Sequence, residues 1–264
     1  MQMRRQILAG MVAVAVSAPA LRHAHAQPTP IQPRDEEGDD ALKALYGDRD
    51  AAQPPYVLYA VSTAGGSRQF TLDRSQPGSV LLQFDGDPEV WALRSSFGTR
   101  GDEFLRNDVG ATMLRITSLG GATLYLEGDT AGSPAAVEGR GRPIPSLRAS
   151  HRNLQATVEA ALPLVQRLTP GPQLRIEAAA GLSPALVEDA YQMVQLALQR
   201  LPRRWFEGRP DRLRRIRCAR GRRLQASFRN GFLELGLVPG IGHAGRPSSL
   251  AIRNALMGTR GIPN

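Results

Sequence analysis

The sequence predicts an α+β protein in which an antiparallel all-β meander, closing as a barrel or a sandwich, precedes a smaller α+β domain. Three observations support this prediction. Short β-rich runs between turn residues fill residues 54–130, and apolar residues at helical spacing mark residues 150–264. A stretch rich in Gly and Pro, residues 131–149, predicts a linker between the two patterns.

The first 26 residues have the pattern of a secretory signal peptide. Arg4-Arg5 forms a basic head, an apolar run covers residues 7–21, and Ala24-His25-Ala26 supplies a cleavage sequence. The run is shorter than the roughly twenty residues that a membrane-spanning helix needs. We therefore expect cleavage after Ala26 and a soluble protein in the periplasm or outside the cell. Both the general and the twin-arginine export routes fit this pattern.

Residues 27–53 predict a disordered leader. The segment begins rich in Pro and continues as Asp35-Glu36-Glu37-Gly38-Asp39-Asp40, so it has few side chains that can form a core. A short helical turn is expected over Ala41–Tyr46. The acidic patch is expected to be solvated, with docking onto the basic half of the chain as the alternative.

The all-β domain is expected from seven short runs, each bounded by Gly, Pro, Asn or Asp. They are Tyr56–Ser62, Arg68–Asp73, Val80–Asp85, Val90–Arg94, Glu103–Asn107, Thr112–Ser118 and Ala122–Leu126. Apolar residues including Phe70, Leu82 and Leu114 recur within these runs and are expected to form one buried face. The regular spacing does not distinguish a barrel from a sandwich.

The second domain is expected to alternate helices and strands. Helices are predicted over Asn153–Leu168, with a kink or a break at Pro163, from Ser183-Pro184 to Leu201, and over Pro247–Leu256. Strands are predicted over Leu174–Ala178, Arg212–Ala219, Leu224–Phe228 and Phe232–Val238. Asn230-Gly231 predicts a tight hairpin turn between the last two.

Few residues remain for the common catalytic and metal chemistries. After removal of the signal, His151 and His243 are the remaining histidines and Cys218 is the remaining cysteine. A zinc site of three His, or of two His and two Cys, therefore cannot be built. We expect no cofactor. His151 is expected at the surface, and Cys218 is expected to be a buried thiol in a strand without a disulfide.

The element order of the second domain is similar to part of a zinc-peptidase core. Such enzymes need His-Glu-x-x-His on a helix, and residues 243–247 here read His-Ala-Gly-Arg-Pro. An inactive relative is compatible with this sequence and an active zinc peptidase is not.

The strongest local candidate for a binding site is the Gly-rich stretch that leads into the last helix. Free backbone N–H groups at a helix start, beside an arginine, can hold an anion. We expect Arg246, Ser248 and Ser249 to bind a phosphate or carboxylate, with His243 lining the site. The alternative is an ordinary capped connection between a strand and a helix.

A second candidate is the basic stretch from Arg203 to Arg223, which holds ten arginines against two acids. Arg212, Arg214, Arg215 and Arg217 form its centre. Such a patch attracts polyanions, anionic lipid headgroups or acidic glycans, while export argues against nucleic acid. A simple solvated face is the alternative, and Trp205 beside the patch is expected in the core.

Six carboxylates gather in the expected loops of the all-β domain, namely Asp85, Asp87, Glu89, Asp102, Glu103 and Asp108. They lack the spacing of a calcium loop, and turn formation accounts for Asp85-Gly86-Asp87-Pro88. Acid–base chemistry by such a pair stays possible.

Three stretches carry a resemblance to a known family. They are residues 83–91 (QFDGDPEVW), residues 106–110 with 119–125 (RNDVG and LGGATLY), and residues 245–249 (GRPSS). The chain resembles an exported alphaproteobacterial family known as domain of unknown function 4908. The resemblance covers most of the chain after the signal and brings no catalytic residues. It implies a Gram-negative cell, and hence the periplasm.

Two classes of function remain. The first is a non-enzymatic periplasmic protein that binds an anionic component of the envelope or a protein partner. The second is a hydrolase that uses carboxylates, or His243 with a serine. The scarcity of His and Cys favours the first.

Overall fold

The computed structural model describes residues 54–63, 66–147, 150–169, 174–207 and 213–258. The chain divides into residues 1–52 and a compact unit over residues 53–264. The signal peptide over residues 1–26 and the leader over residues 27–53 lie outside the described residues, so both stay predictions.

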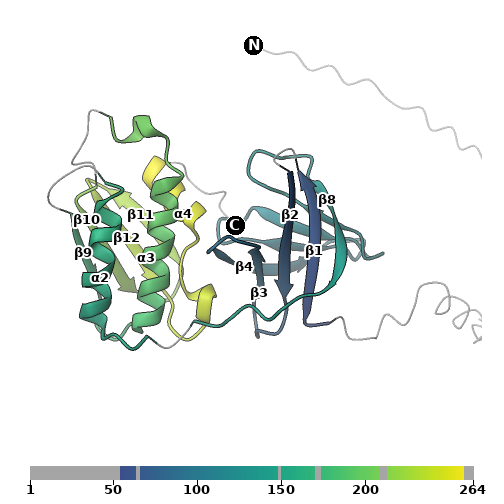
Figure 1. The fold of residues 1–264 in the computed structure, drawn as a ribbon, viewed down its shortest axis with the longest axis horizontal. Coiled ribbons are helices and arrows are strands. Elements are labelled where there is room, and N and C mark those ends of the chain that lie inside the picture. The colour runs from purple at the N-terminus through teal and green to yellow at the C-terminus, as the bar shows by residue number, and fades with distance from the viewer. Residues whose placement is uncertain (1–53, 64–65, 148–149, 170–173, 208–212, 259–264) are drawn as a thin grey trace, which may run out of the picture. The chain divides into compact units, whose positions relative to one another are not determined.

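The first part of the compact unit is a closed antiparallel barrel of eight strands (Figure 1). Every strand pairs with its sequence neighbours, and β1 pairs with β8 to close the ring. The strands are β1 (Tyr56–Thr63), β2 (Gly66–Asp73), β3 (Val80–Phe84), β4 (Val90–Phe97), β5 (Glu103–Arg106), β6 (Thr112–Ile116), β7 (Ala122–Leu124) and β8 (Ser133–Arg140). The α+β class is confirmed, and the barrel is the correct one of the two all-β alternatives.

Strand β8 corrects the prediction of a linker over residues 131–149. Its sequence, SPAAVEGR, is rich in small residues and has weak β propensity, so local sequence does not indicate a strand. It forms because β1 and β7 each present a free edge that needs hydrogen-bond partners. Among the described residues of the expected linker, only 131–132 and 141–147 lie outside this strand.

Side chains fill the interior of the barrel. Phe70, Leu82, Leu93, Leu105 and Leu114 are fully buried there, in line with the predicted apolar face. Tyr59 stacks on Phe70 with ring centroids 5.1 Å apart. The barrel is therefore a packed core, as expected for eight strands.

The second part is a four-stranded sheet in the order β11-β12-β10-β9. Strands β9 (Arg175–Ala178), β10 (Arg215–Arg220) and β12 (Phe232–Leu237) are parallel, and β11 (Gln225–Arg229) is an antiparallel edge. Helices α2 (Leu154–Gln166) and α3 (Pro184–Gln199) pack on one face of this sheet, as Figure 1 shows. Helix α4 (Ser249–Met257) also contributes to this core through Ile252 and Leu256.

Local chemistry sets most of these boundaries. Ser183 caps α3 by accepting from the Leu186 N–H at 3.3 Å, and Pro184 opens the helix, as predicted. Asn230 and Gly231 have φ angles of 51° and 79°, which suit the predicted hairpin turn. Helix α2 runs as one element through Pro163, because the proline stands in its last turn and removes one hydrogen bond.

Three single-residue expectations are confirmed. Cys218 is a free, fully buried thiol in β10, and His151 is exposed. Trp205 is buried, and its indole N–H donates to the Leu256 carbonyl at 3.1 Å. The short 3-10 helices η1 (Arg203–Trp205) and η2 (Gly242–Gly245) were not predicted.

Candidate functional site

Helix α4 begins where the predicted anion site lies. The chain leaves β12, forms η2, and reaches α4 through Arg246 and Pro247. Gly245 makes this path possible, since a Cβ there would stand 2.3 Å from the Val238 carbonyl oxygen. Ser248 is the N-cap and accepts from the Ala251 N–H at 3.1 Å.

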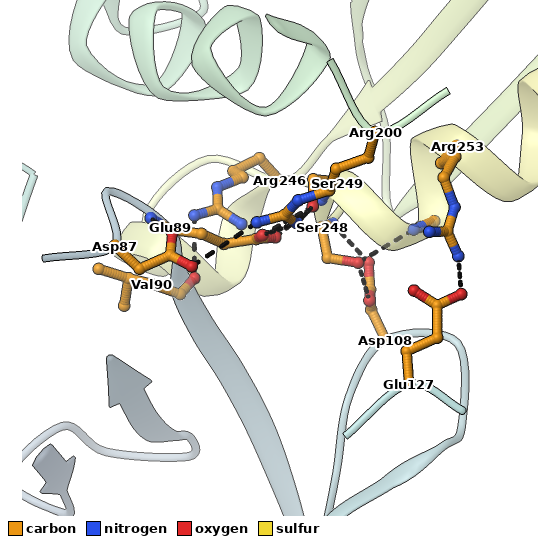
Figure 2. A network of polar contacts seen from close by, with 11 residues as sticks. Asp87, Glu89, Val90, Asp108, Glu127, Arg200, Arg246, Ser248, Ser249 and Arg253 are labelled. Carbon is orange, nitrogen blue, oxygen red and sulfur yellow. Dashed lines mark hydrogen bonds and ion pairs between the residues drawn. The ribbon is translucent and has the colours of Figure 1, made fainter. Parts of the chain in front are cut away.

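Two carboxylates from the barrel occupy the start of α4 (Figure 2). Asp108 accepts from the Ser248 N–H at 2.7 Å and from its hydroxyl at 2.6 Å. Glu89 accepts from the Ser249 N–H at 2.9 Å and from its hydroxyl at 2.6 Å. The helix start thus binds carboxylates, as its chemistry predicts, and these carboxylates belong to the chain itself.

Arg200, at the C-cap of α3, joins the same network. Its guanidinium donates to Glu89 at 2.6 Å, contacts the Ser249 hydroxyl, and lies 3.6 Å from Asp87. Glu89 is fully buried, so these donors balance a charge that would otherwise be costly to desolvate. Sequence reasoning missed Arg200, because nothing local links a helix end to a loop 111 residues away.

Arg246 and His243 converge on a buried carboxylate of α3, Asp189. The Arg246 Nε–H donates to Asp189 at 2.8 Å, and Arg246 also donates to the Val90 carbonyl at 2.9 Å. His243 Nδ1 lies 3.1 Å from Asp189, and its Nε2 lies 3.0 Å from the Pro145 carbonyl. Burial pushes the pKa of Asp189 up, but the hydrogen bond from His243 and the charge of Arg246 hold it below its usual value.

The structure thus brings together His243 and Arg246, which share Asp189. Ser248 and Ser249 instead bind Asp108 and Glu89, so each of the four predicted residues has a partner within the chain. An external anion would have to displace Asp108 or Glu89, so binding of such an anion by Arg246, Ser248 and Ser249 stays a prediction. Both ring nitrogens of His243 face oxygen acceptors, so neither is placed to take a proton from a serine hydroxyl.

A cavity of about 760 Å³ lies at the open end of the barrel, beside this network. The β3–β4, β5–β6 and β7–β8 turns meet at this end, because alternate turns of an antiparallel barrel share one end. Apolar lining comes from Phe84, Trp91, Met113, Tyr125 and Leu250. We call this cavity the barrel-end pocket, and its volume lies within the roughly 300–1,000 Å³ range typical of small-molecule sites.

Three arginines add charge to the lining of the barrel-end pocket, namely Arg68, Arg200 and Arg253. Arg200 and Arg253 have carboxylate partners, Glu89 and Glu127 respectively. Arg68 lies over the Phe84 ring at 4.2 Å, and no acidic residue in the described part of the chain forms an ion pair with it. Its charge is therefore available to a ligand.

Three arginines of the basic stretch, Arg215, Arg217 and Arg220, lie on β10. Arg214, Arg215 and Arg217 are exposed, while Arg212 lies outside the described residues. Arg215 donates to Glu177 at 2.7 Å and 3.0 Å. Trp205 belongs to the core and not to this surface.

Neither a metal centre nor a membrane-spanning helix is found in the residues that the structure describes. Within them, His, Cys, Asp and Glu form no group of three that could hold a metal ion. No helix in the same ranges has the length and hydropathy to cross a membrane.

The family model of a domain of unknown function, DUF4908, matches residues 40–256. The chain belongs to the DUF4908 family. The match runs through the barrel, the second sheet and most of α4, so this DUF4908 domain comprises both parts of the compact unit. No curated protein and no solved structure matches the chain significantly.

Proposed function

We propose that this DUF4908 protein is an exported, non-enzymatic binding protein that holds an amphipathic anion in the barrel-end pocket. The supporting observation is the combination of an aromatic lining with an arginine, Arg68, that has no carboxylate partner among the described residues. An anionic component of the cell envelope with an apolar group has this chemistry.

The apolar part of the ligand would lie against the barrel residues. Phe84, Trp91 and Met113 line the pocket while contributing to the barrel core, so their positions are held by packing. A preformed apolar surface binds an alkyl or ring group with little ordering cost.

The anionic part of the ligand would contact Arg68. A guanidinium beside a low-dielectric aromatic wall interacts more strongly with a carboxylate or phosphate than the same group in open water. Arg253 adds a second donor, since its Nε is buried and has no hydrogen-bond partner in the described structure.

The compartment is part of the same proposal. The signal pattern over residues 1–26 supports export with cleavage after Ala26, and the family resemblance supports the periplasm. Mass spectrometry of the protein purified from its native cell is expected to show a chain that begins at Gln27. Retention of Met1 would contradict export by this signal.

Of the two catalytic routes that the hydrolase alternative allows, the structure leaves geometric support for one. A route through His243 and a serine has no supporting geometry, because both ring nitrogens are engaged. A carboxylate route would use Asp87, Glu127 or Asp129, which line the barrel-end pocket. Turnover of an ester or glycoside probe that is lost in Glu127→Gln would favour it over simple binding.

Binding to the barrel-end pocket can be measured with dodecanoate, using the fluorescence of Trp91 in a Trp205→Phe background. Dodecanoate is expected to bind, and Arg68→Gln is expected to weaken it about tenfold because one charge-assisted contact is lost. Arg140→Gln is the control, since Arg140 is an exposed barrel arginine that does not line the pocket. Equal affinities for dodecanoate in Arg68→Gln and its parent, or no binding at all, would contradict the proposal.

A further inference from the structure

The face of the second sheet that turns away from the helices is open to solvent. Residues opposite one another in neighbouring strands share a face, so the strand register identifies this surface. On the covered face, Ile216, Leu233 and Leu235 are fully buried. On the other face, Arg175, Arg215, Arg217 and Arg229 are all exposed.

One row crosses this open face from edge to edge. Arg175 of β9 pairs with Arg215 of β10, Arg215 pairs with Phe232 of β12, and Phe232 pairs with Arg229 of β11. Four strands about 4.8 Å apart make this row about 14 Å long. Arg215 also lies over the Phe232 ring at 5.6 Å. The row therefore joins three cations to one half-buried aromatic ring.

The next row has a different character. Glu177, Arg217, Glu234 and Ser227 follow one another across the same four strands. Carboxylates accept hydrogen bonds and arginines only donate them, so this row presents alternating acceptors and donors. Glu177 is already engaged by Arg215, while Glu234 has no ion pair within the described ranges.

The β10–β11 loop, with Arg222 and Arg223, borders the open face at the C-terminal ends of β10 and β12. A Cβ at Gly236 would stand 3.1 Å from the Arg223 carbonyl oxygen, so the β10–β11 loop lies against β12 there. Arg222 and Arg223 in this loop are exposed. Positive charge thus flanks the open face as well as crossing it.

We propose that the open face binds an acidic glycan, a ligand site that uses none of the residues of the barrel-end pocket. Acid groups of the glycan would contact Arg175, Arg217 and Arg229, since Arg215 is already paired with Glu177. The Phe232 ring would pack against the apolar side of a sugar. The hydroxyl groups would donate to Glu234 in the second row. Charge complementarity and the mixture of donors and acceptors carry this assignment.

The two glutamates argue for a glycan over other polyanions. A DNA phosphate backbone offers acceptors without hydroxyl donors, so Glu234 would only repel it, whereas a sugar acid places several hydroxyl groups beside each carboxylate. The face also lacks an exposed large apolar side chain, among its described residues, that could enter a bilayer, since Phe232 is half-buried in the row. A hydroxyl-rich acid satisfies both kinds of group.

Polygalacturonate is the probe, tested on the purified protein by calorimetry at low and moderate salt, with dextran as the uncharged control. We expect binding that weakens with salt, and no binding of dextran. Replacing Arg175, Arg217 and Arg229 together by Gln is expected to weaken binding at least about tenfold. The matched control replaces Arg94, Arg100 and Arg140 together by Gln, three exposed barrel arginines, and it is expected to stay within about twofold of wild type.

Glu234→Gln separates a glycan site from a general polyanion surface. Loss of the carboxylate is expected to weaken polygalacturonate binding about threefold or more, whereas it would strengthen binding governed by charge alone. Stronger binding in Glu234→Gln, or no binding by wild type, overturns the proposal. Phosphatidylglycerol vesicles or a poly(dT) oligonucleotide that bind as tightly as polygalacturonate, and lose binding in the triple variant, would also overturn it.

Discussion

Among single residues, the least expected finding is the burial of charge near α4. Asp189 and Arg246 are both almost fully buried, with side chains 8% and 2% exposed, and they contact each other at 2.8 Å. Such a pair stabilises the fold only while both members are present. The contribution of this ion pair to stability can therefore be tested by replacing Asp189 with Asn, which keeps the size of the side chain and removes its charge.

Asp189→Asn is expected to lower the free energy of unfolding by about 3 to 5 kcal/mol, because the charge of Arg246 then has no carboxylate to balance it. Urea unfolding followed by circular dichroism measures this, with the exposed Asp85→Asn as the control. A loss no larger than that of the control would show that Asp189 is not essential to the network.

The same residue predicts a pH dependence. The pKa of Asp189 is lower in the folded chain than its ordinary value of 3.8, so its contribution is present above about pH 4. This contribution is lost as the pH falls through the folded value. The wild-type free energy of unfolding is therefore expected to decrease below about pH 4 more steeply than that of Asp189→Asn. Parallel curves for the two proteins would contradict the assignment.

Cys218 gives a further prediction for a single side chain. Burial raises the pKa of its thiol to about 12, so almost no thiolate exists at neutral pH. Iodoacetamide at about pH 8 is expected to leave the native protein unlabelled and to label it fully in urea, as mass spectrometry reports. Rapid labelling of the native protein would place the thiol at the surface.

Among the helices and strands, the start of α4 shows what a local pattern can and cannot predict. The anion-binding character of the helix start follows from the sequence, whereas the helix begins at Ser249, two residues after the predicted start at Pro247, and Ser248 is its cap. The identity of the anions does not follow from the sequence, because Asp108 and Glu89 lie 140 and 160 residues before the serines that they contact. Nothing near these two carboxylates in the sequence indicates that they bind the start of a helix.

Glu89→Gln tests how far the barrel supports α4. It removes the charge that Arg200 and the helix start share while keeping the size of the side chain. We expect a loss of about 2 to 4 kcal/mol, below the full cost of breaking a buried pair because Arg200 is 35% exposed. Hydrogen exchange is expected to accelerate at residues 250–253 of α4. The exposed Glu138→Gln is the control, and unchanged exchange in Glu89→Gln would refute the coupling.

Across the whole compact unit, the barrel and the second domain share buried polar contacts. Arg246, Ser248 and Ser249 reach from the second domain to Val90, Asp108 and Glu89 of the barrel. Breaking these contacts leaves buried donors and acceptors unpaired, which is costly. The two parts are therefore expected to unfold together.

The two tryptophans of the chain report on the two parts separately, since Trp91 is in the barrel and Trp205 in the second domain. Trp91→Phe and Trp205→Phe are each expected to show coincident unfolding by fluorescence and by circular dichroism. Adding Arg246→Ala is expected to separate the transitions. Separate transitions without that change would show two independent domains.

Local sequence patterns were sufficient to specify most of the individual elements, but not β8, η1 or η2. Period-two and helical patterns placed seven of the eight barrel strands, the four strands of the second sheet and its helices, because these patterns report which face of each element is buried. The Ser183 cap, the Asn230-Gly231 turn and the burial of Cys218 follow from chemistry within a few residues.

The way in which these elements are joined depends on tertiary contacts. Closure of the barrel depends on β8, whose small residues become a strand through pairing with β1 and β7. The partners of the α4 start and the lining of the barrel-end pocket depend on contacts between segments more than a hundred residues apart. A local pattern indicates which residues are buried, but it does not identify a partner that is distant in the sequence. Many loops of this chain carry a carboxylate, and only the packing of the two parts decides which carboxylates reach the start of α4.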